Sequence, residues 1–268
     1  MAVWTRFQQF ITGNSALARW LILFVIAGLL YAVFRSYLRA RKIQPNGFRW
    51  KTFRNEIFFA ILNLAIGATI LGYITSTWTA KGIITFNKAP TTWWVVGLEY
   101  AAYFFAFDTY FYWFHRLMHL EPIYTWVHKI HHRSTSPNML TTLSVSPLES
   151  IINGGFLALF TAAVTVHSST MMLIGPTNIF MGLYVHAGYE FFPRWWNKTW
   201  LTKWFITTTF HDQHHRYFNW NYGGYTTIWD WICGTVRPKF LTDFDQIKAR
   251  TNKSLAAAGA AISSGAGT

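Results

Sequence analysis

Long apolar runs dominate the chain and are separated by short polar segments. Residues 16–34, roughly 56–77 and 91–113 are each long enough to cross a bilayer as a helix, which needs about 20 apolar residues. Residues 150–166 and 171–187 are also apolar but slightly short, so they either cross fully or form a helical hairpin that dips into the bilayer. The pattern predicts an all-α, multi-pass membrane helical bundle with about four to five apolar spans or hairpins.

The basic side chains between the first two runs predict the orientation of the chain. Residues 35–54 contain no acid and seven basic residues: Arg35, Arg39, Arg41, Lys42, Arg49, Lys51 and Arg54. By the positive-inside rule this loop is cytoplasmic, whereas the next loop, which has only Lys81 and Lys88, is on the outer side. The third run then returns to the cytoplasmic face. No small-residue cleavage site follows the first run, so we interpret it as an anchor and not as a signal peptide.

Composition agrees with a membrane protein. The chain is 52% hydrophobic, 19% aromatic and only 12% charged, where a soluble domain carries about 25% charged residues. The net charge of +13 raises nucleic acid as a partner, but the basic residues lie beside apolar runs, which favours lipid headgroups and predicts no nucleic-acid partner. The single cysteine, Cys233, excludes an internal disulfide and a cysteine-built zinc site. We expect an integral protein of a bacterial inner membrane or the endoplasmic reticulum.

Three segments follow from these patterns. Residues 1–91 are predicted to be an N-terminal membrane hairpin with a basic cytoplasmic loop. Residues 92–240 hold all ten histidines and are predicted to be a catalytic domain, with a histidine-rich helical cap on the cytoplasmic face. Residues 241–268 are polar and rich in alanine, glycine and serine, and we expect a disordered tail.

The histidines form a repeated spacing pattern. "HRLMH" supplies His115 and His119, "HKIHH" supplies His128, His131 and His132, and "HDQHH" supplies His211, His214 and His215. Spacings of three and four residues put imidazoles on one face of a helix. His186 lies between the last two groups, at the cytoplasmic end of its apolar run. Imidazole suits iron, zinc, copper or nickel, and eight or nine imidazoles exceed the four ligands of a tetrahedral zinc ion. The pattern therefore predicts two metal ions.

The predicted topology provides an independent check of this site. It places nine histidines on the cytoplasmic side and leaves only His167 at the opposite end, between the two short apolar runs. The topology rests on lysine and arginine alone, so its agreement with the histidine pattern is informative. We predict that His167 is not a ligand.

The histidine pattern resembles that of the fatty acid hydroxylase superfamily, which includes sterol desaturases, methylsterol oxidases and lipid hydroxylases. Further similarities are "SPLES" after the second histidine group and "NYGGYTTIWDWICGT" after the last, and the resemblance covers about residues 92–236. Ser146 departs from it, since many members have histidine before this proline. The resemblance implies a centre of two iron ions that uses O₂ and two electrons to attack an unactivated C–H bond of a lipid. It also implies a separate electron donor, a ferredoxin or a cytochrome b5-like protein.

Several acids are candidates to support the histidines. Asp108 precedes His115 by seven residues and is predicted to accept the free N–H of a ligating ring, with a helix-packing hydrogen bond as the alternative. Asp230 and Glu149 are predicted to act similarly or to cap a turn. Glu190 is an additional candidate ligand, although a solvated surface carboxylate is the simpler interpretation. We expect Asn221, Tyr222 and Gly223 to shape a turn beside the last histidine group.

Two other classes of function fit parts of the pattern. A haem-binding membrane electron carrier needs paired axial histidines on facing spans, and the crowding of histidines near one surface argues against it. A metal-binding or transport protein without redox chemistry predicts acids or histidines partway through several spans, and these runs carry few. Hydroxylation and desaturation both begin with hydrogen abstraction, and the pattern does not distinguish them.

Overall fold

The computed structural model describes residues 29, 32–35, 37–45 and 49–265. The chain divides into two compact units, the residues before Lys42 together with those from Arg250 onward, and Lys42–Ala249. Apart from the part of the C-terminal helix beyond Ala249, the second unit holds the elements described below. The predicted first span, residues 16–34, lies almost entirely outside the described residues.

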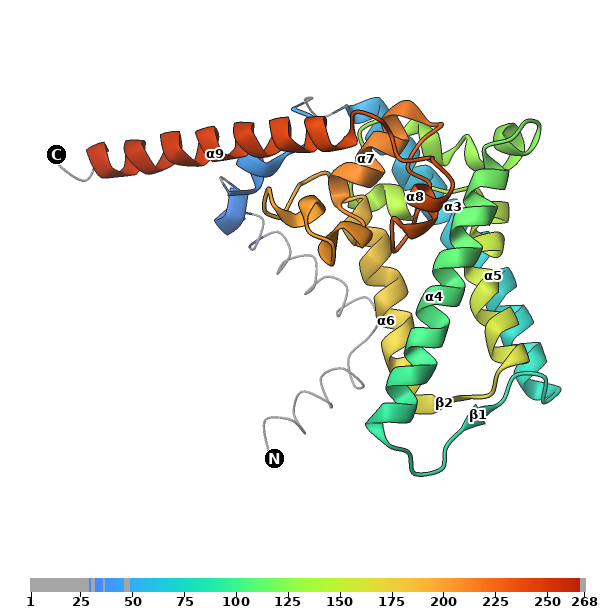
Figure 1. The fold of residues 1–268 in the computed structure, drawn as a ribbon. Coiled ribbons are helices and arrows are strands. Elements are labelled where there is room, and N and C mark those ends of the chain that lie inside the picture. Colours follow the sequence, from blue (N-terminus) through green and yellow to red (C-terminus); the bar gives the residue numbers. More distant parts are fainter. Residues whose placement is uncertain (1–28, 30–31, 36, 46–48, 266–268) are drawn as a thin grey trace. The chain divides into compact units, whose positions relative to one another are not determined.

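Four long helices form the body of the second unit (Figure 1). They are α3 (Trp50–Ala80), α4 (Trp93–Met118), α5 (Pro147–Ala163) and α6 (Ser168–Val185). Helix α5 contacts both α3 and α4, and α4 contacts α6. Helix α5 approaches α3 closely because it has glycine at the contact: a Cβ on Gly154 would lie 2.6 Å from Leu71 Cδ1. Small residues at helix crossings are typical of helices that pack in lipid.

The two ends of this bundle differ. At one end the strands β1 (Phe86–Asn87) and β2 (Val166–His167) pair in parallel. His167 caps α6 there, because its Nδ1 accepts the Ser169 N–H at 3.0 Å. The other end carries the remaining elements with the histidine groups (Figure 1): turns of π- or 3-10 helix at Tyr124–His128, His131–Arg133, Met139–Thr142, Trp196–Lys198 and Thr202–Trp204, and the helices α7 (Thr208–Tyr217) and α8 (Ile228–Ile232). The predicted separation of His167 from the other nine histidines is confirmed.

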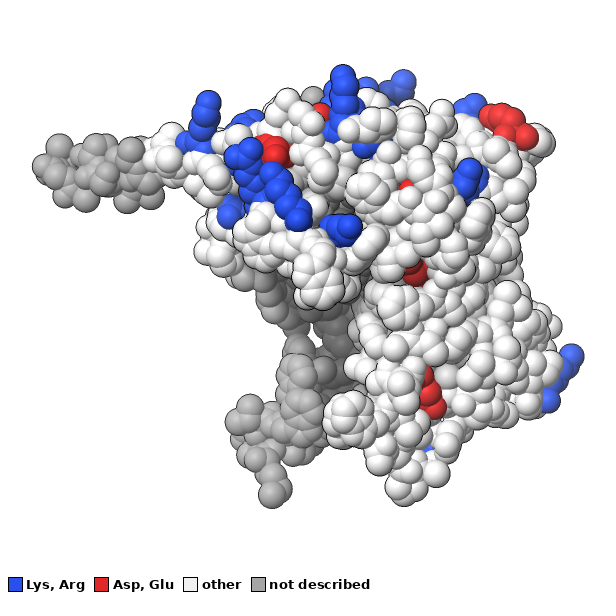
Figure 2. Space-filling model, viewed as in Figure 1, with Lys and Arg blue, Asp and Glu red and all other residues white. Residues whose placement is uncertain are grey.

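The prediction of several membrane spans is confirmed in part. Within the described ranges, one helix, α3, is both long and apolar enough to cross a bilayer by length and composition, and α5 is apolar but has only 17 residues. Helices α4 and α6 do form where apolar runs predicted them. Figure 2 shows that lysine and arginine gather at the histidine-bearing end, whereas the flank formed by α4 is largely uncharged. An uncharged flank of this kind fits contact with lipid.

The C-terminal segment differs from its prediction. The structure has a helix, α9, over Phe240–Gly265 where the sequence pattern predicted disorder. Two physical features explain the difference. Alanine has the highest helix propensity of the residues, and Phe240 and Phe244 at the start of α9 are buried in an apolar cluster with Phe210.

A buried acid on α3 bonds to the segment that follows the histidine motif HKIHH. Glu56 is 2% exposed, and its carboxylate accepts hydrogen bonds from the hydroxyls of Ser134 at 2.6 Å and Thr141 at 2.8 Å and from the Asn138 amide at 2.8 Å. These three donors lie in the irregular segment that follows His132. Glu56 therefore fixes a loop that has little regular secondary structure of its own.

Replacing Glu56 with alanine leaves three buried donors without an acceptor. We expect the free energy of unfolding to fall by about 2–4 kcal/mol, since bonds to charged groups are stronger than average and buried unpaired donors are costly. The measurement is the melting temperature of the purified protein in detergent. Glu121→Ala is the matched control, because Glu121 is exposed and accepts one bond from Thr125. Equal melting temperatures for the two variants would contradict this role.

Candidate metal centre

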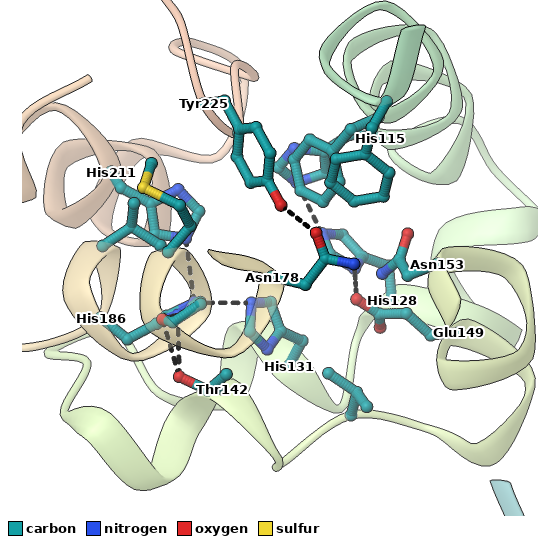
Figure 3. Close-up of a pocket in the computed structure, with 17 residues that line it drawn as sticks. His115, His128, His131, Thr142, Glu149, Asn153, Asn178, His186, His211 and Tyr225 are labelled. Atoms are coloured by element: carbon teal, nitrogen blue, oxygen red, sulfur yellow. Dashed lines mark hydrogen bonds and ion pairs between the residues drawn. The ribbon is translucent and has the colours of Figure 1, made fainter. Parts of the chain in front are cut away.

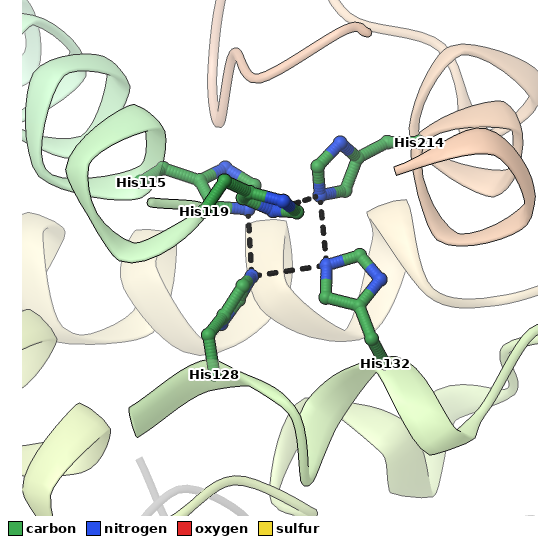
Figure 4. A group of neighbouring side chains, drawn as sticks. All are labelled: His115, His119, His128, His132 and His214. Carbon is green, nitrogen blue, oxygen red and sulfur yellow. Dashed lines mark hydrogen bonds between the residues drawn. The ribbon is translucent and has the colours of Figure 1, made fainter. Parts of the chain in front are cut away.

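Nine histidines meet at one end of the bundle in two groups. The first group contains His115, His119, His128, His132 and His214, and the second contains His131, His186, His211 and His215. Within each group the candidate ligand atoms all lie within 4.8 Å of one another. Figure 4 shows the first group, whose rings reach inward from α4, α7 and the turns between α4 and α5.

The three histidine motifs of the sequence, HRLMH, HKIHH and HDQHH, are called boxes from here on. The spacing within the boxes HKIHH and HDQHH decides how their histidines divide between the two groups. His128 and His132 are four residues apart and stay together in the first group, and His211 and His215, also four apart, stay together in the second. Residues four apart lie on the same side of a helical turn. The middle histidine of each of these two boxes projects to the other side. His131 therefore joins the second group, and His214 joins the first. These two boxes thus each contribute to both groups, whereas His115 and His119 of the box HRLMH both belong to the first group.

The Nε2 atoms face one another at short range. In the first group His128 Nε2 lies 3.0 Å from those of both His115 and His132, and His214 Nε2 lies 3.1 Å from His132 Nε2. In the second group His186 Nε2 lies 2.9 to 3.2 Å from the Nε2 atoms of His211, His215 and His131. Two ligands at right angles, each about 2.1 Å from a metal ion, are about 3 Å apart. The spacing matches imidazoles around a metal.

The opposite ring nitrogens determine which atoms can bind a metal. His115 Nδ1 donates to the Tyr222 carbonyl at 2.7 Å, His214 Nδ1 to that of Trp220 at 2.7 Å, and His186 Nδ1 to that of Gly182 at 2.8 Å. A carbonyl only accepts, so each of these neutral rings has its proton on Nδ1 and a lone pair on Nε2. Several lone pairs therefore converge in each group, an arrangement that a cation stabilises. The residues fit a metal centre.

Burial keeps these rings uncharged. His128, His132 and His214 are almost fully buried, and burial is the main cause that lowers their pKa well below the usual value. Neighbouring histidines lower the pKa further. Neutral imidazole is the form that binds metals. His119 is the exception in exposure, since it is only partly buried.

Glu149 is the carboxylate that contacts a histidine. It is 2% exposed, and its Oε1 lies 2.9 Å from His128 Nδ1. Ser146 positions it, because its hydroxyl caps the first turn of α5 by accepting the Glu149 N–H at 3.0 Å and donates to the Val127 carbonyl at 2.7 Å. Serine at this position therefore links Glu149 to the segment that carries His128.

Of the two roles predicted for Asp108, the structure shows a packing hydrogen bond and no contact with a histidine ring. Its carboxylate accepts the backbone N–H of Tyr225 at 3.0 Å and of Thr226 at 2.8 Å, together with the Thr226 hydroxyl. A carboxylate partway along a buried helix face has no special preference for an imidazole, and here the loop supplies three stronger donors. Asp108 fixes the loop after the last histidine box.

Of the two roles predicted for Asp230, the structure shows the turn role: Asp230 supports a histidine through the backbone and does not contact a ring. It accepts the N–H groups of Tyr222 and Gly223 at 2.8 and 2.7 Å, and the carbonyl of Tyr222 is the acceptor for His115. Gly223 is required at this turn, since a Cβ there would lie 2.2 Å from the Thr226 carbonyl oxygen. Asn221, at a positive φ of 60°, donates from its amide to the Phe210 carbonyl. The predicted turn beside the last box is confirmed.

Glu190 is not part of either histidine group, and its carboxylate is not exposed to solvent, so neither predicted role is met. It is fully buried, and its two carboxylate oxygens accept the N–H groups of Phe192 at 2.9 Å and Thr209 at 3.0 Å. Sequence reasoning missed Glu56 altogether. A lone acid within an apolar span was the available signal, because such residues are seldom without a role.

A cavity of about 180 Å³ adjoins both groups of histidines. Three histidines of the second group and two of the first line it (Figure 3). Most of the remaining wall is apolar and includes Phe107, Phe111, Val145, Met181 and Val185. An apolar cavity with few polar groups is typical of a small-molecule site.

The fold and this site together define a helical protein with two groups of histidines, consistent with a site for two metal ions, beside an apolar cavity. Residues 100–235 match the fatty acid hydroxylase family. The chain is 35% identical over 139 residues to a methylsterol monooxygenase of Aspergillus fumigatus, which covers 50% of this chain and 45% of the relative. It is 30% identical over 224 residues to methylsterol monooxygenase 1 of Gallus gallus, with 80% and 71% covered, and 34% identical over 134 residues to human cholesterol 25-hydroxylase, with 49% and 48% covered.

The chain belongs to the fatty acid hydroxylase family, as the histidine spacing predicted. It matches about half the length of the Aspergillus and human relatives. No solved structure gives a significant match.

Glu149→Gln tests whether this carboxylate supports His128. Glutamine keeps the shape but is a weaker acceptor, so we expect metal affinity to fall by about 10–100-fold. The measurement is metal content after dialysis against a graded series of chelator concentrations. Glu99→Gln is the control, because Glu99 also accepts a backbone N–H, that of His167 at 2.8 Å, but lies at the end of the bundle away from the nine histidines; it should leave the metal content of the folded protein unchanged. The same chelator midpoint for Glu149→Gln and the unaltered protein would overturn the role of Glu149.

Proposed function

We propose that this protein is a membrane-bound oxygenase with two iron ions that hydroxylates an unactivated C–H bond of a lipid. The observation that carries the proposal is the convergence of nine buried or half-buried histidine rings in two groups beside one apolar cavity. The balanced reaction takes the lipid, O₂, two electrons and two protons, and gives the lipid alcohol and water. Hydroxylation is favoured over desaturation because the named relatives are monooxygenases and a hydroxylase.

The two groups of histidines would each hold one iron ion, five ligands in the first and four in the second. Iron bound there would supply the oxidising chemistry. The protein itself keeps water away with the phenylalanine and valine side chains of the cavity wall and holds the substrate carbon beside the second group. With four ligands, that group leaves more coordination positions open than the first. His131, His186 and His211 face the cavity directly.

We further propose a multi-pass arrangement with the histidine end at the cytoplasmic face. Helix α3 meets the length and hydropathy required, and the bundle around it has an uncharged flank. The relatives act on sterols according to their names, so a sterol-like lipid is a candidate substrate. Electrons would come from a separate donor, a ferredoxin or a cytochrome b5-like protein.

The haem-carrier alternative is disfavoured by the ligand count. A haem takes two axial ligands on opposite faces of a flat macrocycle, whereas here five rings surround one point within 4.8 Å. An optical spectrum of the purified protein decides between them, since a haem carrier would show a Soret band.

Removing one histidine from each group tests the paired centre. We expect His131→Ala and His214→Ala each to lower bound iron from about two ions per chain towards one and to abolish lipid hydroxylation, because both ions are needed to reduce O₂. Iron is measured by elemental analysis and hydroxylation by the mass gain of lipids from cells that produce each variant. His167→Ala, at the far end of α6, should retain both iron and activity. Full iron and activity in the first two variants, or iron loss in the third, would refute the assignment.

A further inference from the structure

A continuous series of aromatic rings joins the first group of histidines to the surface of the protein. It begins at Tyr222, whose ring centroid lies 5.1 to 5.8 Å from the centroids of three histidine rings, those of His119, His214 and His115. These three histidines are drawn in Figure 4. Aromatic rings with centroids within about 7 Å of each other are in contact. Tyr222 therefore contacts three candidate ligands of one metal ion.

Three further rings continue the series outward. Tyr112 on α4 is fully buried, and its ring centroid lies 6.3 Å from that of Tyr222. Trp113 and Trp229 follow at 5.4 and 6.2 Å from Tyr112, and their own centroids are 5.8 Å apart. Trp113 is 46% exposed, and the guanidinium of Arg116 lies 5.9 Å from its ring. A charged neighbour places this end of the series near water and not in the lipid interior.

The second group of histidines has no such neighbours. Among the described residues, the ring contacts of its four histidines are all with other histidines. The first group also contacts Phe111, Phe218 and Tyr124. Phenylalanine is much harder to oxidise than tyrosine or tryptophan, and Tyr124 has no described ring contact beyond the histidines. Oxidisable rings therefore lead from the first group to the surface through Tyr222.

The hydroxyl of Tyr112 has an acceptor for its proton. Thr235 donates its single hydroxyl proton to the Asp230 carboxylate at 2.7 Å, so its oxygen accepts the Tyr112 O–H at 2.9 Å. A tyrosine that loses an electron also loses its hydroxyl proton, because the oxidised phenol is a very strong acid. Tyr112 can therefore give up an electron while its proton moves along these hydrogen bonds, and can take both back.

We propose that these four rings, those of Tyr222, Tyr112, Trp113 and Trp229, carry electrons inward to an oxidised metal centre that has no lipid to attack. This inference rests on the proposed oxygenase function and goes beyond it. An oxidant formed without a substrate attacks the nearest side chains, which are the histidines and the cavity wall. Reduction of the centre through the series spares those side chains, because the oxidation is moved to the surface.

The electrons and protons of this path balance. One electron moves from Tyr112 through Tyr222 to the oxidised iron, while the Tyr112 proton moves to Thr235 and the Thr235 proton to Asp230. One electron from Trp113 then restores Tyr112, and the protons return. Trp113 recovers its electron from a small soluble reductant, a thiol or ascorbate. Without a reductant, the loss of two electrons and the addition of one water oxygen convert Trp113 into hydroxytryptophan and release two protons.

The test uses the full-length, iron-loaded protein in detergent, without lipid. The protein is reduced by dithionite under argon, freed of excess dithionite and exposed to O₂ with catalase present, and after repeated cycles peptide mass spectrometry measures the hydroxylation of Trp113. Trp126 is the internal control, because it is 77% exposed and close to His128 in sequence but has no ring contact with another described residue. We expect several-fold more hydroxylation at Trp113 than at Trp126. Zinc-loaded protein should show no excess, since zinc does not change its oxidation state.

Two variants assign the electrons to this series. Tyr112→Phe keeps the ring but removes the oxidisable phenol, so hydroxylation of Trp113 should fall to the level of Trp126. Trp113→Phe removes the surface end, so a tyrosine radical should persist longer in electron paramagnetic resonance spectra of samples frozen after exposure to O₂. Melting temperatures establish that each variant is folded. An excess at Trp113 that Tyr112→Phe leaves unchanged would overturn the inference, because the electrons would have taken another route.

Lipid hydroxylation, measured separately, distinguishes this inference from the function on which it rests. Equal modification of Trp113 and Trp126 in a protein that hydroxylates lipids would refute the inference and leave the oxygenase intact. Selective oxidation of Trp113 that depends on Tyr112, in a protein that hydroxylates no lipid, would support the inference and refute the lipid oxygenase. The absence of both events would count against both proposals.

Discussion

The mutual orientation of nine imidazoles is the constraint on which the rest of this structure depends. Their Nε2 atoms approach to about 3 Å with lone pairs directed at one another, and burial prevents the rings from becoming protonated and hydrogen-bonding among themselves. Such an arrangement is unfavourable without a cation at its centre. Carbonyls that accept from Nδ1 hold the rings of His115, His186 and His214, and the backbone segments that carry the other rings must hold those in place.

Buried acids supply much of that support, and most of them act on the backbone. Glu56 holds the loop after the second histidine box, and Asp108 and Asp230 hold the loop after the third. Glu190 accepts the N–H of Thr209, two residues before His211. These loops have little regular secondary structure, so their N–H groups need acceptors from elsewhere. Glu149 is different, because it contacts a histidine and faces the cavity.

Glu149 lies where the cavity meets the first group of histidines. It lines the cavity, and its Oε1 lies 2.9 Å from His128 Nδ1. The rest of the cavity wall combines histidines of both groups with apolar side chains such as Phe107 and Met181.

The sequence by itself determined the helices, the family and the histidines. Apolar runs predicted α3 to α6, and the spacing of the boxes, which is a local property of helical turns, predicted that His128 and His132 would lie together. Only the tertiary structure decided which histidines of a box lie in the same group. It also decided that Asp108 and Asp230 bond to loops and not to histidine rings. The contact of Glu56 with the segment after His132 is likewise tertiary. Those contacts join residues about 80 to 120 positions apart or lie within irregular loops. Periodicity carries no information about such pairings, because they are set by how the elements pack.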